Sequence, residues 1–169
     1  MLSTEIRRLL DGMIDPSRVN FVGVFPRDME PIDFTRYPSC YVLNTDPSSE
    51  PGQHWVAIFI TSPNNFEFFD SFAMHPSVYH LSYPNVHCVM DFQAQSFASS
   101  VCGHYCVYYL VLRSLAHPPH LISRSFSKFD YNWNDLQVSR FIKKRLHPHY
   151  KCTSICPCTQ SSKPYCKCH

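Results

Sequence analysis

The residues with the clearest chemical potential are a cysteine that opens an apolar segment and three polar residues upstream of it. Cys102 and Gly103 begin the stretch CGHYCVYYLVL, and His54, Asp70 and Gln95 precede them in that order. A thiol nucleophile needs a base, an acid that orients the base, and a donor for the oxyanion that develops during acyl transfer. These residue types supply all of those groups, so the sequence predicts a cysteine hydrolase.

The Cys102 thiol must ionise to act, because a free cysteine has a pKa of about 8.5 and is only a few per cent thiolate near neutrality. The apolar spacing from Cys102 through Cys106 to Tyr109 predicts a helix with Ser99 or Ser100 as its cap. Cys102 would then lie in the first turn, where unpaired amides and the helix dipole favour an anion. The alternative is a small buried helix residue. Cys106, one turn later, is interpreted in that way.

His54 and Asp70 flank two short apolar segments that predict a hairpin. His54 precedes the segment WVAIFI, Asp70 follows FEFF, and the turn sequence TSPNN joins the two. Adjacent strands would bring the carboxylate beside the imidazole, where it holds the ring in the productive tautomer. Trp55 would wall one side of a cleft. The alternative for His54 is a solvated loop histidine.

Gln95 is a candidate for the oxyanion hole. It stands seven residues before Cys102, after a third apolar stretch over residues 86–92. A side-chain amide on this loop can donate to the oxyanion together with the Cys102 backbone amide, and such a donor lowers a barrier by roughly 3 to 4 kcal/mol. Gln93 is a competing candidate for the same role.

The ordered set resembles the adenain family of adenovirus-type maturation proteases, in the ubiquitin-like-protease clan found in double-stranded DNA viruses and virus-like transposons. The His-Trp pair and the segments FVGVFPRDMEPIDF and CYVLNTDPSSEPGQHWVAIFI also carry the resemblance, which spans residues 5–115, about two thirds of the chain. It implies His54 as base, Asp70 as orienting acid, Gln95 in the oxyanion hole and Cys102 as nucleophile. Aspartate replaces the glutamate of adenain at the third position, as in the SUMO-deconjugating branch of the clan.

The same resemblance implies a biological role. We expect a cysteine endopeptidase that cleaves viral capsid and core precursor proteins at Gly-containing sites during virion maturation, located in the virion and the host nucleus. The chemistry would need no cofactor, while double-stranded DNA and an activating peptide would be partners. Cys88, in HCVMDF, resembles the cysteine that bonds to such a peptide through a disulfide. The alternatives are a protease that removes ubiquitin or SUMO and a non-catalytic nucleic-acid-binding protein.

The expected architecture is α+β, with the papain-like or ubiquitin-like-protease arrangement that the resemblance implies. An amino-terminal helix, a central helix from Cys102 packed on the sheet, and further helices after Ala116 covering the other side are predicted. The mixed or antiparallel sheet would contain residues 38–45, 54–60, 65–70 and 86–92. At 169 residues and 44% hydrophobic composition the chain can bury one core, and a monomer is expected. No apolar run reaches the ~20 residues of a membrane span, so no membrane partner is expected.

The carboxyl-terminal part differs sharply in charge from the rest. Residues 1–135 carry 8 Lys and Arg against 13 Asp and Glu, a balance of −5, whereas residues 136–169 carry 7 Lys and Arg and no acid, a balance of +7. Such a swing predicts contact with polyanions. A basic helix that begins at an Asn134 cap would supply the DNA contacts. Its candidate side chains are Arg140, Lys143, Lys144 and Arg145.

We therefore divide the chain into a cysteine protease domain, 1–149, and a Cys-rich basic tail, 150–169. The tail contains five cysteines, namely Cys152, Cys156, Cys158, Cys166 and Cys168. Three states of the tail stay open: a disordered basic segment, a site for zinc or another thiophilic metal, and disulfides in an oxidised virion. No metal is assigned to the protease domain.

Overall fold

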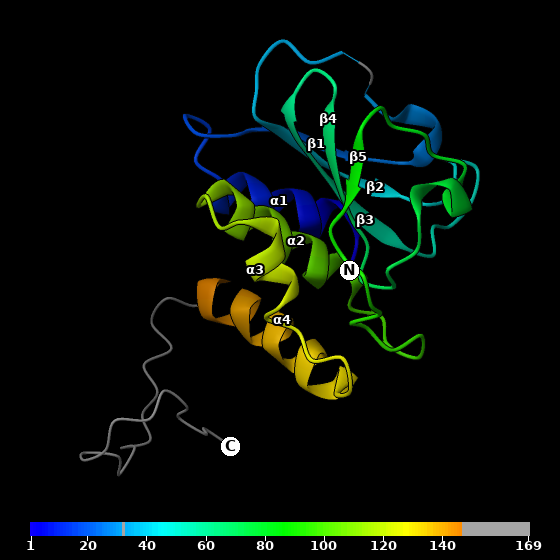
Figure 1. The fold of residues 1–169 in the computed structure, drawn as a ribbon, viewed down its shortest axis with the longest axis vertical. Coiled ribbons are helices and arrows are strands. Elements are labelled where there is room, and N and C mark those ends of the chain that lie inside the picture. Colours follow the sequence, from blue (N-terminus) through cyan, green and yellow to red (C-terminus); the bar gives the residue numbers. More distant parts are fainter. Residues whose placement is uncertain (32, 147–169) are drawn as a thin grey trace.

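The computed structural model describes residues 1–31 and 33–146 and has the predicted α+β composition, with a five-stranded mixed sheet and several helices (Figure 1). In chain order the elements are α1 (Ser3–Met13), β1 (Asn20–Phe25), the 3-10 helix η1 (Arg27–Met29), β2 (Ser39–Asn44), β3 (Trp55–Ser62), β4 (Asn65–Phe69), the 3-10 helix η2 (Pro76–Tyr79), β5 (Val86–Cys88), α2 (Cys102–Ser114), α3 (Pro119–Ser123) and α4 (Tyr131–Leu146). The five tail cysteines lie outside the described residues.

The strands lie side by side in the order of the chain, β1-β2-β3-β4-β5. The central strands β2, β3 and β4 are antiparallel, and the outer strands β1 and β5 run parallel to their neighbours. The predicted hairpin of β3 and β4 is confirmed, with Ala57 opposite Phe69. Because a hairpin brings the start of one strand beside the end of the other, the residues that flank it, at positions 54 and 70, fall at the same edge of the sheet.

The two outer strands differ from the prediction, because β1 was missing from it and β5 is shorter than expected. β1 was not among the predicted strands. It pairs on one side only and is interrupted by a bulge at Gly23, whose φ of +148° favours glycine and where a Cβ would lie 2.9 Å from the ring of Phe25. The predicted segment 86–92 forms a strand only over Val86–Cys88. The Val89 amide still donates to Phe68 O at 2.9 Å, and the ladder ends there.

The helices gather on one side of the sheet (Figure 1). α2 packs against β3, against α1, which itself lies on β1, and against α4. It is therefore buried on most of its circumference, as a helix with apolar residues all round should be. The Phe69 and Tyr109 rings stack at 4.5 Å between centroids and join β4 to α2. The helix that begins with Cys102 is therefore held firmly against the strands.

The other face of the sheet is covered by loops, so the prediction that helices after Ala116 would cover it was wrong. α3 and α4 instead pack against α2. The loop residues Phe34 and Tyr83 cover the far face, where Phe34 stacks on Tyr41 at 5.9 Å and Tyr83 stacks on Phe66 at 5.3 Å. Large aromatic side chains bury enough apolar area to close this face without a helix.

α4 begins earlier than predicted and uses a different cap. The Asp130 carboxylate accepts a hydrogen bond from the Trp133 amide at 2.9 Å, as a helix cap does. Asn134, the predicted cap, is a buried residue inside the helix. Its side-chain amide donates to Ala94 O at 2.9 Å and to Ser127 O at 2.8 Å. Asn134 thus ties α4 to the segment that leads toward Gln95.

None of the helices in the described ranges combines the length and the apolar character that a membrane crossing requires.

Candidate active site

The hairpin brings His54 and Asp70 into direct contact. His54 lies one residue before β3 and Asp70 one residue after β4, and both side chains are buried. The His54 Nε2 and the Asp70 Oδ1 are 2.7 Å apart, the distance of a strong charge-assisted hydrogen bond. Nε2 of His54 is therefore hydrogen-bonded to the acid, and Nδ1 is the ring nitrogen that remains for a nucleophile.

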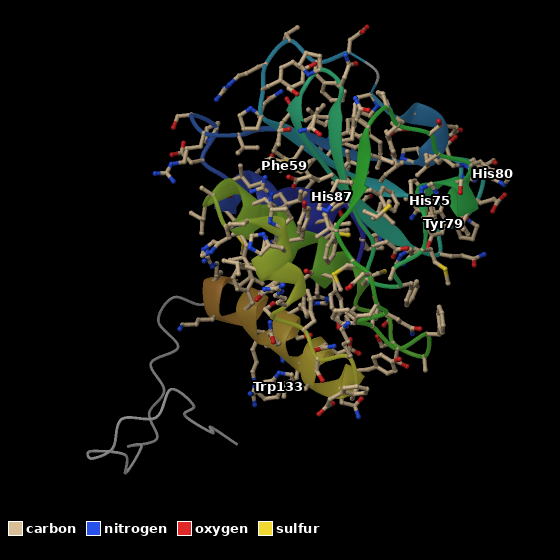
Figure 2. All side chains as sticks on the ribbon, in the orientation of Figure 1. Phe59, His75, Tyr79, His80, His87 and Trp133 are labelled. Atoms are coloured by element: carbon tan, nitrogen blue, oxygen red, sulfur yellow. The ribbon has the colours of Figure 1, made fainter. Side chains whose placement is uncertain are left out.

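Four donors fix the Asp70 carboxylate. Besides His54, the Phe72 amide donates to Oδ1 at 2.9 Å, and the Met74 amide and the Tyr79 hydroxyl donate to Oδ2 at 3.1 and 2.8 Å. Burial raises the pKa of Tyr79, and the charge of Asp70 raises it further, so the phenol stays protonated and remains a donor. Tyr79 comes from η2, at the edge of the molecule where Figure 2 labels it with His75 and His80. A carboxylate held in this way can orient the imidazole without rotating.

The environment of His54 favours its protonated form. Burial lowers the pKa of the imidazole, but hydrogen bonding to Asp70 and the coupling to Cys102 outweigh that loss and raise the pKa to about 9. Phe72 stacks on the ring at 4.4 Å between centroids with an interplanar angle of 22°. Nδ1 is buried and makes no hydrogen bond of standard geometry, although the thiol is close enough for the two groups to shift each other's pKa. The resting contact is therefore looser than a formed hydrogen bond, as apo sites often are.

Cys102 is the first residue of α2 and is buried. Burial raises the pKa of its thiol, but the nearby imidazole of His54 and its charge, together with the backbone amides of Trp55 and Gly103, bring the pKa below its ordinary value. The prediction that Ser99 or Ser100 caps this helix was wrong. The cap position is Val101, which offers no side-chain hydrogen bond, so the first amides of α2 remain available to an anion.

The other cysteines that the structure describes have the opposite electrostatic environment. Burial raises the pKa of Cys40, Cys88 and Cys106, and at Cys106 the nearby Cys102 and Asp70 add to the effect. None of these thiols is in a disulfide. Among the four cysteines in the described ranges, Cys102 alone combines a helix start, a histidine partner and a lowered pKa.

Gln95 is buried and held at both ends of its amide. Its Oε1 accepts a hydrogen bond from the Ser71 hydroxyl at 2.7 Å, and its Nε2 donates to Ser99 O at 2.9 Å, on the segment that enters α2. The amide nitrogen therefore points toward the chain leading to Cys102 and keeps a second hydrogen. Gln93 differs, because its Nε2 donates to the backbone oxygen of Gln95 at 2.7 Å and supports that residue. Of the two glutamines, Gln95 is the better placed for an oxyanion donor.

The start of α1 closes over the start of α2. A Cβ at Gly103 would lie 3.1 Å from the Ile6 side chain and 3.2 Å from that of Met1, so glycine allows this close approach. The Trp55 indole donates to Met1 O at 3.2 Å and extends the same contact toward β3. The glycine after Cys102 is thus explained by the packing of two helices.

Two hollows flank the His54-Trp55 pair. One, of about 300 Å³, is lined by His54, Phe72 and Tyr79, and the other, of about 410 Å³, by Trp55 and the turn at Gly52. A larger cavity of about 510 Å³ lies apart from these, where β5 faces α3, and Cys88 lines it. Cys88 does not line the two hollows at His54 and Trp55, although it pairs with Phe68 on β4, and burial together with the charge of Asp70 raises the pKa of its thiol.

The basic candidates lie on a different element from the catalytic ones. All four belong to the exposed surface of the last turns of α4. The guanidinium of Arg145 lies 4.6 Å above the Phe141 ring, which holds part of this charge near the helix. The side chains that could contact DNA are Arg140, Lys143, Lys144 and Arg145.

Sequence reasoning missed the residues that support the site. Phe72, which stacks on His54, Tyr79, which donates to Asp70, and Ser71, which holds Gln95, all lie in the segment after β4. Loop residues of these types carry no periodic signal. The one sequence feature that could have indicated Ser71 and Phe72 is that they directly follow Asp70. In the described ranges, His, Cys, Asp and Glu side chains form no group of three or more suited to a metal ion.

Compared with models of known protein families and with curated proteins, the chain matches none of them.

Proposed function

We propose that this chain is a cysteine endopeptidase of the adenain type, with the papain-like or ubiquitin-like-protease architecture. The observation that supports this most is the arrangement of His54, which hydrogen-bonds Asp70 at 2.7 Å through one nitrogen and leaves the other for a thiol whose pKa is lowered. A buried acid, an imidazole and a cysteine at a helix start are the parts that thiol catalysis requires.

The proposed reaction has two steps, the acylation of Cys102 and the hydrolysis of the acyl-enzyme. The Cys102 thiolate attacks the scissile carbonyl and forms a carbon–sulfur bond, and the oxyanion receives hydrogen bonds from the Cys102 amide and the Gln95 side chain. Protonated His54 then gives its proton to the departing amine as the carbon–nitrogen bond breaks. Neutral His54 takes a proton from the water that hydrolyses the acyl-enzyme, which restores the thiolate and imidazolium. Asp70 orients the ring throughout.

The proposed substrates are viral capsid and core precursor proteins cut at Gly-containing sites, in the virion and the host nucleus. The hollow lined by Trp55 and the turn at Gly52 supports this proposal, since it can take an extended Gly-containing peptide. The activating peptide at Cys88 and double-stranded DNA at the end of α4 are proposed as partners. The cysteines beyond residue 146 belong to no step of this reaction.

Two other functions have specific support. The aspartate at position 70 is the choice of the SUMO-deconjugating branch, which favours a protease that removes ubiquitin or SUMO. The balance of +7 over residues 136–169 favours a nucleic-acid-binding protein. In the first case the same catalytic groups act on a different substrate. In the second they would be unused.

A substrate panel tests the three functions together. Fluorogenic Gly-X-Gly peptides, ubiquitin and SUMO derivatives are incubated with the protein, with and without double-stranded DNA. Cleavage of the peptides supports the endopeptidase, cleavage of the modifiers alone supports the deconjugating enzyme, and DNA binding without any cleavage supports the third function. Cys102→Ala is the inactive variant, and Cys106→Ala, one turn along the same helix, is its matched control.

A further inference from the structure

An exposed phenylalanine ends a row of rings that begins at the imidazole. The Phe72 ring lies 4.4 Å from the His54 ring, and the Phe97 ring lies 4.7 Å from Phe72 with an interplanar angle of 37°. Phe97 is 65% exposed, whereas large aromatic side chains are mostly buried in folded domains. One part of Phe97 is therefore packed toward the site while the rest can contact a ligand.

The segment that carries Phe97 is a built turn. Ser96 accepts the amide of Ser99 through its backbone oxygen at 3.0 Å and the amide of Ala98 through its hydroxyl at 3.2 Å. Gln95, the residue before this turn, is anchored by Ser71 at 2.7 Å. The position of Phe97 relative to His54 is thus fixed from both sides, by local hydrogen bonds and by the Phe72 ring.

The chemistry of the proposed reaction says which part of a substrate meets these rings. The imidazole gives its proton to the departing amine, so the residues after the scissile bond must lie on the His54 side of the thiol. Phe72 and Phe97 extend from that side in steps of 4.4 and 4.7 Å. Since an extended peptide advances about 3.3 Å per residue, the first two residues after the scissile bond come within reach of Phe97.

We infer that Phe97 binds substrate and selects an apolar side chain at the first or second position after the scissile bond. This inference rests on the proposed function and adds a preference on the leaving-group side of the cut. An apolar side chain that covers the exposed ring removes both surfaces from water, whereas a charged one would lose hydration there. A ring contact of this kind corresponds to roughly a 10-fold preference.

Matched peptides test the inference. They share every residue up to the scissile bond and carry Gly, Leu or Asp at the first or the second position after it. In the wild-type chain, kcat/KM is expected to be about 10-fold higher with Leu than with Gly or Asp at one of those positions. Phe97→Ala should abolish this preference by lowering kcat/KM for the Leu peptide to the level of the Gly peptide, mainly through KM. Phe97→Leu should retain part of the preference.

A second exposed phenylalanine supplies the control. Phe129 is 94% exposed and lies beside the start of α4, so Phe129→Ala should keep the Leu preference. A peptide methyl ester releases only methanol, which is too small to cover the Phe97 ring, so wild type and Phe97→Ala should hydrolyse it at similar rates. A loss of ester hydrolysis in Phe97→Ala would mean that the ring supports the catalytic groups themselves, and would overturn its role in selecting substrate.

Trapping the acyl-enzyme gives an independent readout. Leucine amide and glycine amide are offered as competing acceptors, and wild type should transfer the acyl group to leucine amide about 10-fold more efficiently while Phe97→Ala does not discriminate. Cleavage by the wild type without any such preference would overturn the inference and leave the proposed function standing. Failure to cleave any of these substrates would instead contradict the proposed function.

Discussion

Two buried carboxylates lie close together in the sequence, Glu67 within β4 and Asp70 directly after it, and they have very different hydrogen-bond partners. Glu67 accepts hydrogen bonds from Arg113 Nε at 2.7 Å, Arg113 Nη2 at 2.9 Å and the Tyr109 hydroxyl at 2.6 Å. Asp70 accepts from His54, from two backbone amides and from Tyr79. Both acids are therefore fully hydrogen-bonded, as buried charges must be.

The difference between the partners decides what each pair can do. Burial lowers the pKa of Arg113, but hydrogen bonding to Glu67 outweighs it and the net shift is upward, so this guanidinium keeps its proton at every accessible pH. The Glu67 pair can only fasten β4 to the far end of α2. His54 can gain and lose a proton, and a third group, Cys102, lies beside it. The same type of buried acid therefore stabilises the fold at one place and, in the proposed mechanism, orients the catalytic base at the other.

The largest expected effect follows from removing either reacting group. Cys102→Ala and His54→Ala should each lower kcat by roughly 10⁶-fold, because members of one catalytic unit lose nearly the whole effect when either is removed. Urea unfolding should change little by comparison. The measurement is single-turnover cleavage of a fluorogenic Gly-containing peptide. Turnover at the wild-type rate in His54→Ala would contradict the assigned pair.

Asp70→Asn should come next, with a loss of roughly 10⁴-fold in kcat, because an amide in place of the carboxylate favours the wrong tautomer of the imidazole. His54→Ala should remain the slower variant. Glu67→Gln is the matched control, since it makes the same change at the other buried acid of β4. If both acid-to-amide variants lost the same activity per folded molecule, the distinction between the two carboxylates would be wrong.

Glu67→Gln should show its main effect in stability. Removing one charge from a buried ion pair leaves Arg113 without its counter-charge and costs roughly 3–5 kcal/mol of the free energy of unfolding. Urea denaturation followed by circular dichroism measures this loss. Cleavage per folded molecule should stay close to wild type at temperatures where the variant is folded. A Glu67→Gln protein that is as stable as the wild type but inactive would contradict this prediction, because the Glu67–Arg113 pair would then act in catalysis.

Gln95→Ala should lower kcat by roughly 10²- to 10³-fold with a small change in KM, as expected for a donor that acts mainly in the transition state. Gln93→Ala is the comparison, because Gln93 supports only the backbone of Gln95. Its loss should be several-fold at most. Steady-state kinetics on one peptide compare the two variants, and equal losses at both positions would indicate that the loop, rather than the Gln95 amide, is responsible.

The smallest effect concerns pH. Because the pKa of Cys102 is lowered, its thiolate persists until the pH falls below the ordinary cysteine range, and because the pKa of His54 is raised to about 9, the imidazolium persists until the pH rises through that value. The profile of kcat/KM should therefore be a broad bell with an alkaline limb near pH 9. In the residual activity of Asp70→Asn that limb should move to lower pH, since the hydrogen bond that His54 donates to Asp70 raises the pKa of His54. An alkaline limb at the same pH in Asp70→Asn and in the wild type would show that Asp70 does not control the pKa of His54.

Local sequence was sufficient to predict that the proposed catalytic side chains His54 and Asp70 lie together. His54 and Asp70 flank a hairpin whose strands and turn are contiguous, so their proximity follows from local pairing. A helix starting at Cys102 follows from apolar spacing, although the expected serine caps were wrong because the chain already turns at residues 96–99 and the cap position falls on Val101.

The parts that could not be predicted depend on contacts between distant segments. Asparagine is a residue type that favours the first position of a helix, but Asn134 lies inside α4, where its side-chain amide makes buried hydrogen bonds to Ala94 and Ser127. β1 is an edge strand with a glycine bulge, which weakens the apolar alternation of a strand. Tyr79 reaches Asp70 through the conformation of a loop and a 3-10 helix, and sequence spacing does not encode that conformation.

Covalent labelling tests the central claim, that Cys102 is the thiolate prepared by His54, most directly. A Gly-containing peptide that ends in a thiol-reactive vinyl sulfone is incubated with the folded protein near neutral pH, and the modified residue is identified by peptide mass spectrometry. The account predicts stoichiometric modification of Cys102, lost in His54→Ala and retained in Cys106→Ala. Modification of Cys40, Cys88 or Cys106 in place of Cys102, or an equal rate in His54→Ala, would contradict it.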